Sequence, residues 1–345
     1  MDGNQKAIGN RQLTRMKRTF YILGCLLLSL VATAQTVNGI TNVPDTFFNL
    51  TKEMEKVKKQ HPFIVLPADE RNAFIEEKRN INYYKPSKRF LQLDAFFPKQ
   101  NKGYEKLQPA IIIIHGGGWR SGNRTQHHAL AQALAVKGYA CFTPEYRLST
   151  EAYYPAAVQD VKAVVQWVKT NAKKFSVDTN KIVVMGFSAG GQLAALVGNT
   201  NGYQKFEPVT KLKASTNVQA IVDLDGTLSF IHTESSETKP SPNIGASEYW
   251  LGYNTTENPE LWKEASPLSH AGAHSLPTLF LNSSVERMHA GREDYISILQ
   301  QHKIYTEVHT FENSPHSFCL FEPWFTPTVN YITGFLQKIF PDAHH

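Results

Sequence analysis

Continuous apolar runs alternate with segments of helical periodicity along most of this chain. Apolar runs that indicate strands buried on both faces lie at 109–114, 139–144, 181–185, 218–224 and 277–282. Helical spacing predicts helices at about 127–137, 155–175, 190–199, 292–302 and 328–339, and a last strand is predicted at 304–311. Strands and helices in alternation predict an α/β fold, a mostly parallel, doubly wound sheet with helices on both faces.

Three other segments complete the expected organisation. Residues 90–97 alternate in part and end at Pro98, which predicts an edge strand. Residues 226–270 are rich in Ser, Pro, Gly and Trp without a clean period, which predicts an inserted cap or loop. Residues 44–80 are charged and loosely helical. We therefore expect an N-terminal helical extension over 35–80 and one main domain over 81–345.

The first 34 residues have the pattern of a signal peptide. Lys17 and Arg18 precede an apolar run over 20–31, and the small residues at 32–34 form a cleavage site before Gln35. The run is too short for a permanent bilayer span, so no stable membrane span is expected after cleavage. This pattern predicts a secreted or periplasmic protein.

Charge and cysteine content exclude two classes of protein. The net charge is +6, but the first 34 residues hold five of the 36 basic side chains and one of the 30 acidic ones. The remainder therefore carries only about +2, without the clustered cations that nucleic-acid binding requires. After signal cleavage only Cys141 and Cys319 remain, too few for a disulfide framework.

A serine stands between two glycines at a strand-to-helix junction, in the sequence Gly186-Phe187-Ser188-Ala189-Gly190. A sharp turn there exposes the hydroxyl, and glycines two positions to either side leave room for it. The helix that follows directs its N-terminus at the same place and stabilises negative charge. The pattern therefore predicts that Ser188 is a nucleophile. The alternative is a serine without a catalytic role in a tight turn.

Three consecutive glycines follow the strand at 109–114, in the sequence His115-Gly116-Gly117-Gly118-Trp119. Such a loop exposes backbone N–H groups, which stabilise the tetrahedral oxyanion of acyl transfer. We expect Gly116 and Gly117, together with the N–H of Ala189, to be the donors. Neither the Walker spacing nor the dinucleotide-binding glycine pattern fits this loop, so no cofactor is implied.

A serine nucleophile requires a base, and His316 lies in the loop after the last predicted strand. That is where the base belongs when the chain order is serine, acid, histidine. Six other histidines compete poorly with it: His309 lies in a predicted strand, the others at helix ends (His127, His128 and His302) or at the chain terminus (His344 and His345). His270 and His274 have a metal-like spacing, but a glycine lies between them and no glutamate follows, so no metal is implied.

With these motifs in this order, residues 80–340 resemble the α/β-hydrolase fold, and most of all the esterases of the hormone-sensitive-lipase and feruloyl- or acetyl-esterase type. The segments LDAFFP at 93–98, PEYRL at 144–148 and YPAA at 154–157 support the resemblance. It implies that 81–345 is an α/β-hydrolase catalytic domain, and that Glu145, Tyr146 and Arg147 support the glycine loop.

The acid departs from the pattern of these esterases, which usually place an aspartate just after the strand that here ends at Asn282. Glu286 is nearest to that place and is our expected acid. Asp294, at a helix start, and Asp225, after the preceding strand, are the alternatives. Arg287 and His289 in the same loop are either substrate contacts or partners of Glu286 or Asp294.

The sequence thus predicts a secreted serine carboxylesterase that works through a Ser-His-acid triad and an acyl-enzyme. The resemblance implies a short acyl group, acetyl foremost, on a small ester or an acylated plant-type polysaccharide. A serine peptidase or amidase on the same fold, or a non-catalytic binding protein on a hydrolase scaffold, are the alternatives. The oligomeric state is not indicated.

Overall fold

The computed structural model of the chain describes residues 36–43, 45, 48–68, 73–99, 106–238 and 241–341. The predicted signal peptide over 1–34 lies outside these residues. Nowhere in the described ranges is a helix long and apolar enough to cross a bilayer.

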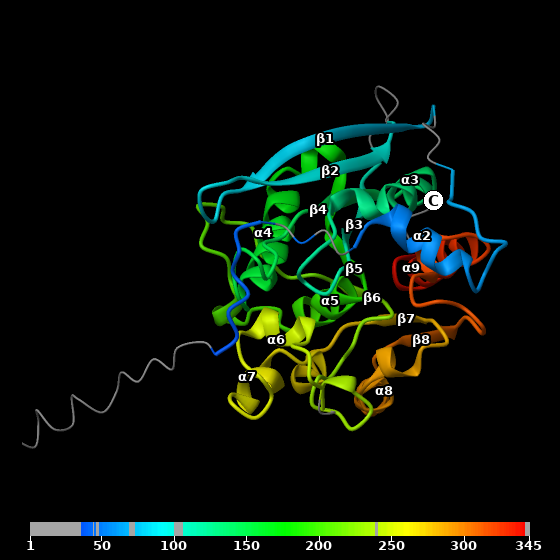
Figure 1. The fold of residues 1–345 in the computed structure, drawn as a ribbon. Helices are drawn as coiled ribbons and strands as arrows, with labels where there is room; N and C mark the ends of the chain where they lie inside the picture. The colour runs from blue at the N-terminus through cyan, green and yellow to red at the C-terminus, as the bar shows by residue number, and fades with distance from the viewer. Residues whose placement is uncertain are drawn as a thin grey trace, which may run out of the picture. The chain divides into compact units, whose positions relative to one another are not determined.

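In the described part of the chain, eight strands form one sheet in the order β1-β2-β4-β3-β5-β6-β7-β8 (Figure 1). The pairs β1–β2 and β2–β4 are antiparallel, and all other neighbours are parallel. The strands are β1 (Ile75–Tyr84), β2 (Leu91–Pro98), β3 (Gln108–Ile114), β4 (Ala140–Pro144), β5 (Val177–Phe187), β6 (Ala220–Leu224), β7 (Thr278–Asn282) and β8 (Thr306–Thr310). The mostly parallel, doubly wound sheet is therefore present.

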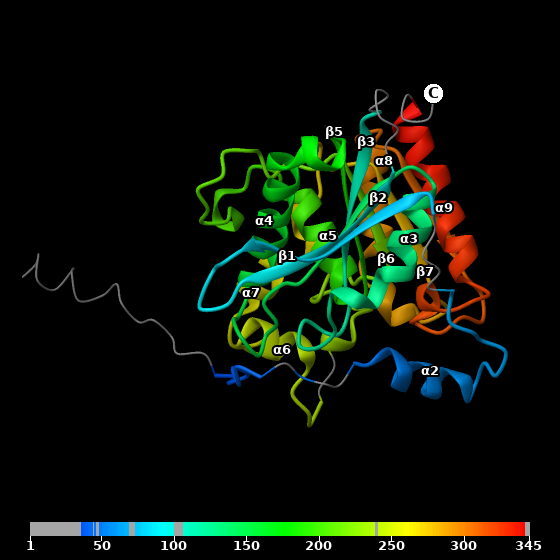
Figure 2. The ribbon, with the colours of Figure 1, turned by 90° about the horizontal axis from the view of Figure 1, so that it is seen from above.

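Helices cover both faces of this sheet, with α4 and α5 on one side and α3 and α9 on the other (Figure 2). The helices are α2 (Leu50–Lys58), α3 (His128–Val136), α4 (Ala156–Thr170), α5 (Ala189–Asn199), α6 (Ala246–Leu251), α7 (Pro259–Glu264), α8 (Arg292–Gln301) and α9 (Phe325–Ile339). The short helices α6 and α7 lie within 226–270, where an inserted cap or loop was expected.

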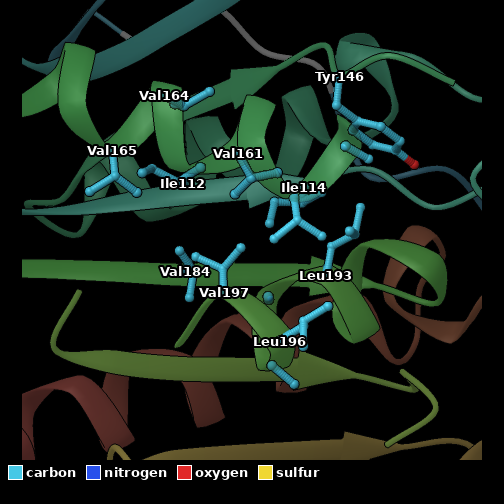
Figure 3. Packing of buried hydrophobic residues seen from close by; sticks show 14 of the residues in the cluster. Ile112, Ile114, Tyr146, Val161, Val164, Val165, Val184, Leu193, Leu196 and Val197 are labelled. Atoms are coloured by element: carbon cyan, nitrogen blue, oxygen red, sulfur yellow. The ribbon is translucent and has the colours of Figure 1, made fainter. Parts of the chain in front are cut away.

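Strand β3 shows why the apolar runs predict the sheet so well. Its side chains alternate between the two faces, so Ile112 and Ile114 pack with α4 and α5 while Ile111 and Ile113 pack with α3 and α9. Figure 3 shows the first of these cores, where Val161 of α4 and Leu193 of α5 lie near Ile114. Cys141 and Cys319 are both buried and unpaired, and they pack in the second core.

The expected helical extension over 35–80 is only partly correct. Helix α2 is present, and the Asn49 side chain caps it by accepting from Thr51 N and Lys52 N. Residues 75–80, however, belong to strand β1, which pairs antiparallel with β2. Consequently β2 is not the edge strand that its sequence suggested, because β1 covers its outer side.

The segment before α2 lies beside the cap. Val37 N donates to Gly252 O at 3.0 Å, and Gly39 N donates to the Tyr153 hydroxyl at 3.1 Å. Further along, the Asp45 carboxylate pairs with Arg120 Nε at 3.0 Å. These contacts hold the N-terminal segment next to the glycine loop, although the two are far apart in sequence.

Candidate active site

Ser188 lies at the junction between β5 and α5, in a backbone conformation that few residues adopt. Its φ is 55° and its ψ is −120°, so the chain turns sharply at the serine itself. A Cβ on Gly186 would lie 2.1 Å from Gly190 O, and one on Gly190 would lie 2.2 Å from Ile114 O. Both glycines are therefore sterically required, and the turn presents Oγ at the carboxyl end of the sheet.

His316 contacts the serine hydroxyl directly. Its Nε2 lies 2.9 Å from Ser188 Oγ, and the imidazole ring packs against the Phe187 ring with centroids 4.8 Å apart. The loop that carries the histidine is tied to the loop after β7, because Ser284 Oγ donates to Ser314 O at 2.8 Å. The structure thus brings together the two residues that the sequence selected as nucleophile and base.

The carboxylate next to His316 is that of Asp225, which corrects the expectation for the acid. Asp225 Oδ2 lies 2.7 Å from His316 Nδ1, and Asp225 follows β6 directly, in a left-handed conformation with φ of 56°. Aspartate tolerates this conformation better than most residues. The acid position therefore lies after β6 and not after β7.

Glu286 and Asp294 both lie away from the imidazole. Glu286 is exposed on a short 3₁₀ turn beyond β7, and Asp294 is exposed in the first turn of α8, 3.5 Å from His232 Nε2. Ser283 directly follows β7, near where the acid was expected, and its N–H donates to Asp225 Oδ1 at 2.8 Å while its hydroxyl donates to Oδ2. The end of β7 thus supplies donors to an acid on the neighbouring strand.

Asp225 is fully buried and nevertheless ionised. Burial by itself would raise the pKa of its carboxyl, but hydrogen bonds from His289, His316 and Ser283, with the charge of His316, lower that pKa well below its usual value. An ionised carboxylate only accepts hydrogen bonds, so His316 Nδ1 must carry a proton. In neutral His316 the Nε2 lone pair is then free to accept from the Ser188 hydroxyl, as a general base requires.

The glycine loop supplies a different pair of donors from the expected one. Gly116 N donates to the buried Gln126 Oε1 at 2.7 Å, which removes Gly116 from the expected oxyanion donors. The N–H groups of Gly117, Gly118 and Ala189 make no hydrogen bond within the described residues, and both glycines line a cavity that reaches Ser188. Gly117, Gly118 and Ala189 are therefore the candidate donors, whereas Gly116, Gly117 and Ala189 were expected.

Two cavities meet at Ser188 and His316. The first has a volume of about 190 Å³ and is walled by Trp119, Phe230 and Met288 among others. The second, of about 440 Å³, extends to the N-terminal segment at Asp45 and Phe48. Ser188 and His316 thus lie where the two cavities adjoin.

Sequence reasoning missed Gln126, Gly118, Ser283 and the contact of His289 with Asp225. His289 Nε2 lies 3.2 Å from Asp225 Oδ1, and among the described residues it forms no ion pair with the expected partners Glu286 and Asp294. One signal for the acid was present in the sequence, because Asp225 and Gly226 directly follow the strand that neighbours the serine strand.

Known proteins of similar sequence or structure are named as esterases. Esterase LipC of Mycobacterium tuberculosis is 28% identical over 243 residues, which are 68% of this chain and 59% of that protein. The chain thus spans less than two thirds of the length of this curated relative. A truncated carbohydrate esterase from gut microbiota superimposes with a TM-score of 0.64 at 23% identity, over 79% of this chain and all of that one.

A thermophilic esterase of Thermogutta terrifontis, solved with butyrate bound, gives a TM-score of 0.63 at 23% identity and covers 77% of this chain and 95% of its own. These structural likenesses and the strand order show the α/β-hydrolase fold. The BD-FAE family model matches residues 93–289, more than half of the chain. From this match, the chain belongs to the BD-FAE family.

Proposed function

We propose that this protein is a secreted serine carboxylesterase that hydrolyses short-chain acyl esters, acetyl esters foremost, on plant-type polysaccharides. The observation that carries the proposal is the continuous chain from the Ser188 hydroxyl through the His316 imidazole to the buried Asp225 carboxylate, at 2.9 and 2.7 Å. A positioned base and acid of this kind turn a weak hydroxyl into a nucleophile.

In the proposed reaction, Ser188 Oγ attacks the ester carbonyl while its proton passes to His316 Nε2. The N–H groups of Gly117, Gly118 and Ala189 stabilise the oxyanion, and Asp225 stabilises the imidazolium. The imidazolium then protonates the departing alcohol. The acyl group stays on Ser188 as an ester. Water attacks that ester with His316 again as base, and the acid is released with the hydroxyl restored.

The smaller cavity supports a short acyl group. Its volume of about 190 Å³ suits a few carbon atoms rather than a long acyl chain. Its wall is rigid, because Trp119 stacks on Trp250 at 4.7 Å and its Nε1–H donates to Gln192 Oε1 at 3.0 Å. The butyrate-bound esterase of similar fold also supports this size class.

The larger cavity supports a polyhydroxylated alcohol. It combines an aromatic ring, Tyr249, with charged groups on Asp45 and Arg120, and the Arg120 guanidinium lies 4.3 Å from the centre of that ring. Sugars bind to such mixtures of aromatic faces and hydrogen-bonding side chains. The carbohydrate esterase that shares the fold supports the same class.

Secretion is proposed from residues 1–34, with cleavage before Gln35. Expression of the full chain in a bacterium tests it: we expect the protein outside the cytoplasm, with an intact mass that corresponds to a chain starting at Gln35. Retention of the full mass inside the cell would contradict this part of the proposal.

The catalytic proposal is tested with a fluorophosphonate probe and a substrate panel. We expect one adduct, on Ser188, and hydrolysis of p-nitrophenyl acetate in preference to the octanoate and to aminoacyl anilides. Release assays on acetylated and feruloylated xylan and pectin then identify the natural acyl group. Absence of an adduct would favour a binding protein, and preference for the anilides would favour an amidase.

A further inference from the structure

The Asp225 carboxylate lies between two imidazoles. His316 Nδ1 contacts Oδ2 at 2.7 Å, and His289 Nε2 contacts Oδ1 at 3.2 Å. The aspartate side chain has no exposed surface, and that of His289 is only 11% exposed. The base is thus one of two histidines that share a single buried negative charge.

The hydrogen-bond pattern fixes which nitrogen of His289 carries the proton. An ionised carboxylate cannot donate, so Nε2 of His289 must be the donor. Nδ1, which makes no hydrogen bond to the described residues, is the nitrogen that takes up a second proton. In the neutral form His289 orients the carboxylate, and in the charged form it also places a cation against it.

His289 is close to the site without facing the substrate. Its neighbours Arg287 and Met288 line the smaller cavity, whereas His289 lines neither cavity that reaches Ser188. Its short 3₁₀ turn, Glu286–His289, runs from the loop after β7 towards α8. The direct contact of His289 with the catalytic residues is therefore its hydrogen bond to Asp225.

We propose that His289 is a positioning residue: its Nε2–H holds Asp225 Oδ1 so that Oδ2 stays on His316, and its own protonation weakens the acid. The proposal rests on the esterase function proposed above. When His289 is charged, it offsets the negative charge that stabilises the imidazolium of His316 in the transition state. Protonation of either histidine then reduces the rate.

The charges around His289 must be considered together with it. The titratable and charged groups of the described residues on the elements around it are Glu286 and Arg287 on its own turn, Asp225, His232, Glu234 and Glu237 after β6, Arg292, Glu293 and Asp294 at the start of α8, and Glu312 and His316 after β8. Of these, only Asp225 makes a hydrogen bond or ion pair with His289 in the described residues. The carboxylate is accordingly the group through which a change in the charge of His289 reaches the base.

Two substitutions of His289 separate its hydrogen bond to Asp225 from its ability to become charged. The amide nitrogen of H289Q can donate to Asp225 Oδ1 but cannot become charged, whereas H289A removes the donor. For H289A we expect kcat to fall about tenfold with an unchanged KM, because a hydrogen bond to a charged group is lost outside the substrate cavities. For H289Q at pH 8 we expect kcat within about twofold of wild type.

The pH profile is the readout that a purely structural role would not change. The acid limb of the wild-type kcat/KM profile should require two ionisations, and that of H289Q only one. Matched controls are E286Q, on the same turn, and H232Q, which removes a nearby histidine that pairs with Glu234 and Asp294. Both controls should keep the wild-type profile.

The outcomes separate this inference from the function on which it rests. If wild type hydrolyses esters and labels on Ser188, but H289A keeps wild-type kcat or H289Q keeps two ionisations, the role of His289 is overturned and the esterase stands. If H289Q is as impaired as H289A, the orienting hydrogen bond is refuted. If the wild type neither labels nor hydrolyses, the proposed function itself fails. Unfolding midpoints of each variant show whether the fold is intact.

Discussion

A carboxylate as deeply buried as that of Asp225 is ionised only because donors surround it. Ser283 contributes its N–H and its hydroxyl, and the imidazoles of His316 and His289 contribute one N–H each. In other settings a buried carboxyl without such donors keeps its proton. Asp223, two residues earlier on β6, is an example: burial raises the pKa of its carboxyl well above the usual value, although Gly226 N donates to it.

Replacement of Asp225 by asparagine should therefore reduce kcat by about 10³- to 10⁴-fold, because the amide favours the wrong tautomer of His316. E286Q and D294N are the matched carboxylate-to-amide changes at exposed positions and should remain near wild type. Initial rates on p-nitrophenyl acetate check all three. A large loss in E286Q with full activity in D225N would refute Asp225 as the acid.

Gln126 supports the site indirectly. Its Oε1 accepts a hydrogen bond from Gly116 N, which fixes the glycine loop that carries the N–H groups of Gly117 and Gly118. Q126M keeps the size of the side chain but leaves a buried N–H without an acceptor. We expect a loss of about 1–3 kcal/mol in the free energy of unfolding and about tenfold in kcat. The control Q159M removes only a long, exposed hydrogen bond to Lys205 O and should change neither quantity measurably.

The serine and the histidine were predictable because each stands in a local context that sequence displays, a glycine-flanked junction and the loop after the last strand. The acid and Gln126 were not, because their roles depend on which loops lie side by side. Glu286 lies nearer than Asp225 to the place where the acid was expected, but the carboxylate that contacts His316 is that of Asp225.

At the scale of elements, the turn between β5 and α5 tolerates no side chain at its two glycines. G186A and G190A each place a methyl group against backbone oxygen at 2.1 and 2.2 Å, so neither can be relieved by a side-chain movement. We expect both variants to lose more than about 4 kcal/mol of unfolding free energy or to fail to fold. Denaturant titration measures this.

The matched control is Gly334 in α9, where an added Cβ meets nothing within 4 Å. G334A should stabilise the protein by about 0.5–1 kcal/mol, because alanine loses less conformational entropy in a helix. A destabilised G334A, or a G190A of wild-type stability, would contradict this description of the turn.

The elements that sequence predicts best are those whose burial is uniform. β3, β6, β7 and the second half of β5 are buried on both faces, and their largely apolar runs are visible without knowledge of the neighbours. β1 is different: its sequence IEEKRNINYY is largely polar, and seven register pairs with β2 define it as a strand. Such pairing depends on the tertiary fold, which explains why residues 75–80 were assigned to a helical extension.

At the scale of the whole molecule, two buried histidines couple stability to pH. Burial lowers the pKa of His115 to about 4, although its contact with Gly116 O raises it, and burial together with the nearby His115 and His128 lowers the pKa of His127 to about 3. Neither group binds a proton in the folded state near pH 6, whereas both bind one in the unfolded chain below about pH 6.5.

The unfolded state consequently holds more protons between pH 6.5 and 4, and stability falls as the pH falls through this window. Each group contributes a slope of up to about 1.4 kcal/mol per pH unit. H127L should flatten the slope, and H302Q, at an exposed histidine, should leave it unchanged. Urea unfolding at pH 4.5, 5.5 and 7 measures the slopes, and an H127L slope equal to that of wild type would contradict the prediction.

The acid after β6 has a consequence for the recognition of other proteins. A search that aligns chains on the expected carboxylate after the seventh strand finds Asn282-Ser283 here and would class such a chain as defective. The informative pattern is instead a pair of features, an Asp-Gly after the sixth strand together with a serine after the seventh. Chains that carry both should be grouped with intact enzymes, and chains that carry neither are the better candidates for lost activity.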